Sequence, residues 1–123
     1  MKISATILLA ASLVLTTAPA FAINYPVSGD WGESSETEPG PIDCTGKRQI
    51  RFEGVQRFDS NGGVPYYRVK YVVQEGNASF RVTEEFDTAQ INARITYSLN
   101  LIDPDRIEIV MSPGGILPLK RCS

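Results

Sequence analysis

Few residues of this chain are of the types that most often act as nucleophile, base or metal ligand. Its 123 residues include two cysteines and no histidine. Without histidine there is no imidazole base for a Ser-His-Asp or Cys-His arrangement and no histidine ligand for zinc. The adjacent carboxylates Glu84 and Glu85 would point to opposite faces of a strand, so they could not share a proton-transfer step. The sequence also lacks a Gly-x-Ser-x-Gly motif and a Gly-rich phosphate loop. We therefore predict a non-catalytic protein without cofactor or metal.

The two cysteines, Cys44 and Cys122, permit a single intramolecular pairing. A reactive or metal-binding thiol pair would need a much closer spacing. In an exported protein, which meets an oxidising environment, two such distant cysteines favour a structural disulfide. The bridge would tie the end of the chain to its first third.

The strongest local anomaly in charge lies between residues 23 and 43. This segment carries five carboxylates and no Lys or Arg, whereas residues 44–123 have a net charge of +2; the five are Asp30, Glu33, Glu36, Glu38 and Asp43. Prolines and glycines predict an acidic, flexible connection at about residues 32–43. It could be an arm that binds a basic partner or plugs an enzyme cleft. The alternative is a solvated connection whose charge complements the chain's own basic outer face.

Three tyrosines, Tyr67, Tyr71 and Tyr97, fall on the apolar sides of the strands that we predict. A tyrosine combines an apolar ring with a hydroxyl, which suits a pocket that orients a small ligand. The alternative is core filling, because side chains can just fill the interior of a barrel of about eight strands.

The first 22 residues have the layout of a secretory signal peptide. Lys2 precedes an apolar or small stretch over residues 5–17, and Ala20-Phe21-Ala22 is a small-x-small cleavage site. The apolar stretch is too short for a membrane span. We therefore expect residues 1–22 to be removed and residues 23–123 to form one exported domain, periplasmic or extracellular.

The elements that must position these residues are strands. In residues 91–101 every odd position is apolar and every even position polar, so one face of this strand would meet a core. Similar alternation and intervening turn residues predict strands at 27–31, 47–53, 66–74, 79–86, 91–101, 106–111 and 116–121, with a short extra one at 55–58.

Short connections favour an antiparallel up-and-down meander of these seven or eight strands, because parallel crossovers need about a dozen residues. Such a meander hides its apolar face by curling into a small barrel; a two-sheet sandwich is the alternative. Pro118 cannot donate to a ladder, which argues against perfect closure. Glu84 interrupts its apolar face, so Glu84-Glu85 is a predicted bulge site.

Gly29-Asp30-Trp31 near the mature N-terminus and Lys120-Arg121 near the C-terminus resemble the lipocalin or calycin superfamily of small β-barrels. The resemblance implies that Trp31 closes one barrel end and that Arg121 covers its ring by a cation–π contact. The chain is nearer in length to small bacterial relatives that inhibit secreted proteases than to a standard lipocalin. The alternative for Trp31 is a large core residue.

These features lead us to expect a binding module for a small apolar or amphipathic ligand inside the barrel, at Trp31, Tyr67, Tyr71, Tyr97 and Arg121. The alternatives are an inhibitor of a secreted or periplasmic enzyme, of the protease or lysozyme class, and a structural envelope protein. The net charge of −2 gives no reason to expect nucleic acid as a partner.

Overall fold

The alternating segments form eight antiparallel strands in a computed structural model, which describes residues 24–123. The short extra strand exists, and the observed bounds differ from the predicted ones by at most two residues at either end. The strands are β1 (Gly29–Glu33), β2 (Gln49–Glu53), β3 (Gln56–Asp59), β4 (Tyr67–Gln74), β5 (Ser79–Asp87), β6 (Asn92–Asp103), β7 (Arg106–Met111) and β8 (Gly115–Arg121). The predicted signal peptide at residues 1–22 lies outside the described residues.

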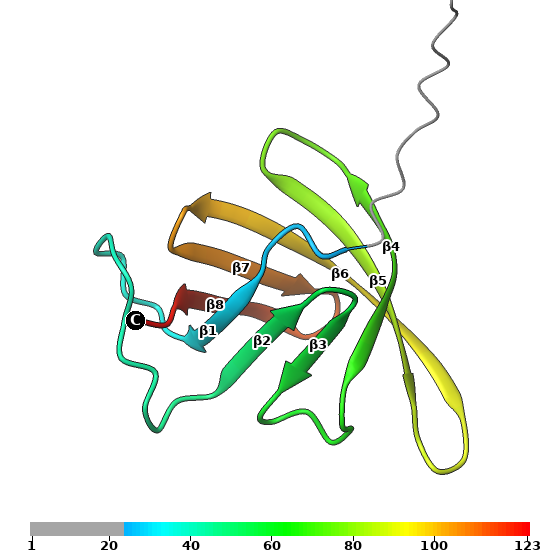
Figure 1. Cartoon of the computed structure of the whole chain (residues 1–123). Coiled ribbons are helices and arrows are strands. Elements are labelled where there is room, and N and C mark those ends of the chain that lie inside the picture. Colours follow the sequence, from blue (N-terminus) through cyan, green and yellow to red (C-terminus); the bar gives the residue numbers. More distant parts are fainter. Residues whose placement is uncertain (1–23) are drawn as a thin grey trace, which may run out of the picture.

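Each strand pairs with the next along the chain, and β8 pairs with β1, so the meander is a closed barrel and not a sandwich (Figure 1). Trp31 and Arg121 are directly opposite across the closing pair. The imperfect closure expected from Pro118 is wrong. Its carbonyl accepts from the Ser34 amide at 3.1 Å, so the backbone polar groups of Pro118 face β1. Ser34 lies just beyond the end of β1, and the missing N–H of Pro118 therefore removes no bond from the ladder.

The barrel core is formed by the apolar faces of the strands, which alternate with polar outer faces. In β6, Tyr97 and Leu99 are buried, as the alternation predicts, but Ile91 precedes the strand and is 61% exposed. The other buried members of the apolar cluster are Tyr25, Trp31, Ile50, Phe52, Val69, Val72, Val82, Ile107, Ile109 and Leu119.

A β-bulge lies in β4 between Val69 and Tyr71, and not at the predicted site in β5. Val69 pairs with Glu84 and Tyr71 with Thr83, so one residue of β4 is left without a partner. An extra residue reverses the facing of the side chains that follow it. Tyr71 is consequently on the outer face and 41% exposed, which contradicts its expected place inside the barrel.

The predicted disulfide joins Cys44, in the connection between β1 and β2, to Cys122, directly after β8. Next to it, Ile42 and Cys122 form a parallel bridge. Figure 1 shows the connection between β1 and β2 standing away from the barrel beside the C-terminus. The C-terminal end of the chain is thus fastened to the β1–β2 connection at one side of the barrel. No helix within residues 24–123 is long and apolar enough to cross a membrane.

Candidate functional site

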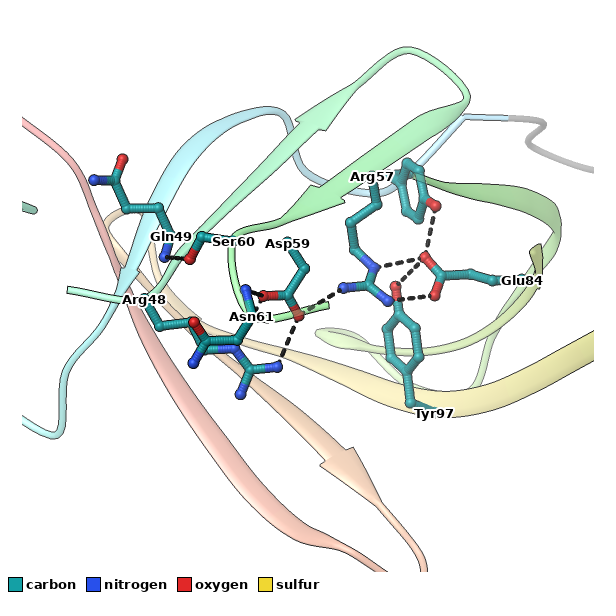
Figure 2. A network of polar contacts seen from close by, with 9 residues as sticks. Arg48, Gln49, Arg57, Asp59, Ser60, Asn61, Glu84 and Tyr97 are labelled. Atoms are coloured by element: carbon teal, nitrogen blue, oxygen red, sulfur yellow. Dashed lines mark hydrogen bonds and ion pairs between the residues drawn. The ribbon is translucent and has the colours of Figure 1, made fainter. Parts of the chain in front are cut away.

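The barrel interior holds an ion pair between Arg57 on β3 and Glu84 on β5 (Figure 2). Arg57 Nε and Nη2 donate to the two Glu84 carboxylate oxygens at 2.7 and 2.8 Å. The Glu84 residue is fully buried, and Arg57 is only 5% exposed. This bidentate geometry offsets part of the large cost of removing both charges from water.

Two tyrosines complete the hydrogen bonding of this carboxylate. The Tyr25 and Tyr97 hydroxyls both donate to Glu84 Oε2, at 2.6 and 3.1 Å. Burial and the Glu84 charge raise the pKa of both phenols far above its ordinary value, so both hydroxyls remain donors. Four hydrogen bonds therefore hold the Glu84 carboxylate, three at Oε2 and one at Oε1. Because the residue is fully buried, its charge is used within the barrel and not presented to solvent.

Asp59 extends the network toward the end of β3. It accepts from Arg48 Nη2 at 2.7 Å and from the Asn61 amide at 2.9 Å, and Arg57 Nη1 lies 3.6 Å away (Figure 2). Burial alone would raise the pKa of Asp59, but the hydrogen bond from Arg48 lowers it below its ordinary value. Asp59 therefore stays charged, and the interior is filled at this end by paired ions.

The five residues expected to bind a ligand are not gathered in one cavity. Tyr97 belongs to the Glu84 network, and the Arg57 guanidinium lies over the Tyr67 ring, 4.1 Å from its centre. Tyr71 is on the outer face. None of these three tyrosines lines any of the five hollows that stand out over residues 24–123.

Trp31 and Arg121 do meet, in the contact that the resemblance implies. Trp31 is buried, with 1% exposed, and the Arg121 guanidinium lies 4.4 Å from the centre of its ring. Carbonyl oxygens of Ser28 and Pro104 accept from Arg121 at 3.1–3.4 Å. Both aromatic and cation border a hollow of about 500 Å³ at the barrel end, together with Tyr25.

Sequence reasoning missed Arg57 and Tyr25 as partners of Glu84. One signal was available, since Glu84 interrupts an otherwise apolar face of β5. That interruption alone predicts a bulge, but a carboxylate on a core face also requires buried donors. The sequence does not show which residues supply these donors, because Tyr25 and Arg57 lie 59 and 27 residues away from Glu84.

A second hollow, of about 340 Å³, lies on the outside of the barrel between the β1–β2 connection and strands β6 to β8. We call it the outer groove. Its apolar lining includes Ile102 on β6 with Ile116 and Pro118 on β8, and Ile102 and Ile116 are 46% and 62% exposed. Glu36 of the connection and Glu108 of β7 line the same groove. It is accessible, unlike the barrel interior.

The arginines leave no positive charge free to balance the connection. All eight have a carboxylate oxygen within 4.0 Å. Over residues 24–123, six of the 14 carboxylates form no ion pair, and these are Glu33, Glu36, Glu38, Asp43, Glu53 and Glu108. Four of these six lie on the connection or line its groove, and Glu33 is the last residue of β1. Of the five acidic residues singled out in the sequence, only Asp30 neutralises a basic residue of the sheet, Arg51. The expectation that the segment complements the chain's own basic face therefore holds for this residue alone.

The connection is fastened at several points. The Ser34 amide donates to the Pro118 carbonyl of β8, and the Ile42 amide donates to the Arg121 carbonyl at 2.9 Å. Lys120 Nζ donates to the Glu38 carbonyl. Lys120 is 2% exposed, so the connection covers this cation against the barrel wall. The Glu36 and Glu38 residues remain exposed. The arrangement can therefore present fixed negative charge to another molecule.

Comparison with protein-family models, with curated proteins and with solved structures finds no match to this chain. Among residues 24–123, no group of three or more Cys, Asp or Glu side chains is placed to hold a metal ion. The described part of the chain thus has a barrel interior filled by paired side chains and accessible surfaces outside it.

Proposed function

We propose that this protein is an exported, non-catalytic binding module that recognises a basic surface of another exported protein and acts as an enzyme inhibitor. One observation carries the proposal: the backbone of the β1–β2 connection is fastened to the barrel, while its Glu36 and Glu38 carboxylates are exposed and form no ion pair within residues 24–123. The Trp31–Arg121 contact supports a lipocalin-like relationship of the barrel, and the signal-like N-terminus supports export.

We favour a protein partner over a ligand inside the barrel because side chains already occupy the interior. Arg57, Glu84 and Tyr97 satisfy one another there, with Tyr25 as a fourth member. A ligand would have to displace these bonds and leave buried charges unpaired, which costs several kcal/mol, of the order of 3–5.

The connection is suited to recognition because its conformation is constrained before binding. A disulfide and a parallel bridge hold its end, and the Lys120–Glu38 contact holds its middle. A segment fixed in this way loses less conformational entropy on binding than a free arm does. Its unpaired charges would attract a basic partner and speed the encounter at low salt.

The test is capture from the exported fraction of the producing cells by the immobilised mature protein. The Glu36→Gln, Glu38→Gln double variant removes two charges without deleting backbone that covers Lys120. A double variant with Glu53→Gln and Glu75→Gln removes the same charge elsewhere. We expect a basic protein to be retained by the wild type and this control, to be released by salt, and to lose its enzymatic activity when bound. If the wild type retains nothing beyond what the Glu36, Glu38 variant retains, the proposal is wrong.

A second candidate function, binding of a small amphipathic ligand, is favoured by the hollow at the barrel end. Its volume of about 500 Å³ lies in the range of small-molecule sites, and Arg121 borders it beside the apolar Leu101. An anionic group there would compete with Asp105, whose Oδ1 lies 3.4 Å from Arg121 Nε. The probe is dodecanoate, added to the mature protein with Arg121→Gln as the variant. Saturable binding that weakens at least tenfold in the variant supports this candidate, and no binding of dodecanoate at millimolar concentration refutes it.

A further inference from the structure

The outer groove combines an apolar floor with carboxylates that form no ion pair. Ile102 and Ile116 come from β6 and β8, which are not neighbours, yet both line one hollow with Pro118. Surface isoleucines are ordinary when scattered, whereas their convergence in a hollow marks a contact site.

The charge at the groove is negative because its one arginine is already paired. Arg106 lines the groove, but its Nε bonds Asp103 Oδ2 at 2.7 Å. Glu36 and Glu108, which also line the groove, have no ion pair within residues 24–123. A cationic group entering the groove would therefore meet two carboxylates without displacing an existing partner.

The dimensions of the groove fit a short stretch of chain. A hollow of about 340 Å³ holds a few side chains, and its wall at residues 34–37 offers the hydroxyls of Ser35 and Thr37. Such a wall can hydrogen-bond an extended backbone, while the isoleucine floor accepts an apolar side chain. A purely apolar ligand would leave the two carboxylates unused and partly desolvated, which is unfavourable.

We propose that the outer groove binds an extended segment of the partner protein, in which an apolar side chain is flanked by Lys or Arg. The apolar side chain contacts Ile102 and Ile116, and the flanking cation pairs with Glu36 or Glu108. This inference rests on the proposed function and names the chemistry of the partner at one part of that surface.

The direct test uses the peptide acetyl-Lys-Leu-Lys-amide, with acetyl-Lys-Ser-Lys-amide and acetyl-Glu-Leu-Glu-amide as matched probes. Isoleucine methyl signals of the mature protein are followed by NMR during titration. We expect saturable shifts at Ile102 and Ile116 with the first peptide, and at least threefold weaker binding of the other two. Equal binding of all three peptides, or shifts confined to other sites, would overturn the proposal.

Variants separate the two contributions. Ile116→Ser and Glu108→Gln should each weaken peptide binding at least threefold, and only the second should also reduce its dependence on salt. The matched control is Val73→Ser on β4, because Val73 is also an exposed apolar residue but lies outside the groove. Unchanged binding in both groove variants would contradict the assignment.

The capture experiment distinguishes failure of this inference from failure of the proposed function. If Ile116→Ser retains the basic partner as well as the wild type does, the groove assignment is wrong and the proposed function stands. If the wild type retains no partner, the proposed function falls, and the inference falls with it. Concentration-dependent dimers that Ile116→Ser abolishes would assign the groove to a second copy of the chain and overturn the inference.

Discussion

Arg57 and Glu84 form a bidentate ion pair inside the barrel, and both side chains are buried. The pair joins β3 to β5 across the interior, where a small barrel usually has apolar side chains or a ligand. It therefore fixes the relative positions of two strands that are not neighbours and fills the space in which a ligand was expected.

Removing one partner of this pair should be strongly destabilising. We expect Glu84→Gln to lower the free energy of unfolding by about 3–5 kcal/mol, because Arg57 would keep its buried charge without its main counterion. The measurement is urea unfolding followed by circular dichroism. Arg57→Met combined with Glu84→Leu should recover only part of the loss. A buried pair can be replaced by apolar groups, but the Tyr25 and Tyr97 hydroxyls lose their acceptor. A loss below about 1 kcal/mol in Glu84→Gln would contradict the burial of the pair.

The two tyrosines of the network should resist ionisation. Their pKa is raised in the folded state by burial and by the Glu84 charge, so they stabilise the fold below the ordinary phenol pKa of 10.0. This stabilisation is lost progressively as the pH rises above that value, because the unfolded chain then binds fewer protons.

Absorbance at 295 nm during an alkaline titration measures this directly. We expect part of the tyrosinate signal to emerge only when the chain unfolds, in step with the circular dichroism. Tyr25→Phe and Tyr97→Phe should each reduce that delayed amplitude by one tyrosine. Delayed amplitude of wild-type size in either variant would show that the phenol is accessible in the folded protein.

The disulfide should contribute a large part of the stability. Cys44 and Cys122 are 78 residues apart, and closing a loop of this length is worth about 4.5 kcal/mol in the chain-entropy treatment. We expect the double variant with Ser at both positions to unfold at lower denaturant concentration, with a loss of up to this size. Wild-type protein treated with a reductant should match the variant. No change in the unfolding midpoint would show that the bridge constrains little.

Gly32 should not tolerate a side chain while the disulfide is in place. A Cβ at this position would lie 2.5 Å from Cys44 Sγ, which is closer than real contacts allow. We expect Gly32→Ala to cost about 1–3 kcal/mol by overpacking. The cost should shrink when Cys44 and Cys122 are both Ala, because the sulfur is then absent. Gly63→Ala is the control, since nothing lies within 4 Å of its Cβ position. Equal costs in both backgrounds would place the strain elsewhere.

The candidate site could be predicted only in part. The acidic segment at residues 23–43 and the apolar residues Ile102 and Ile116 are visible in the sequence, but their meeting at one groove depends on how the connection folds back on β8. The tyrosine pocket is the instructive error. One extra residue in β4 turns Tyr71 outward, and no residue type in that stretch marks the bulge.

The strands, their meander order and the cysteine pairing can be predicted from the residues alone, because alternation, turn residues and the count of cysteines are local or combinatorial features. Three features follow only from the packed barrel: its closure past Pro118, the bonding of Glu84 by Arg57 and Tyr25, and the position of the connection over Lys120. These outcomes depend on register and on contacts between residues far apart in the chain, such as Lys120 and Glu38, which are 82 positions apart. Such contacts are selected by the packing of the whole barrel and leave no periodic signal in the chain.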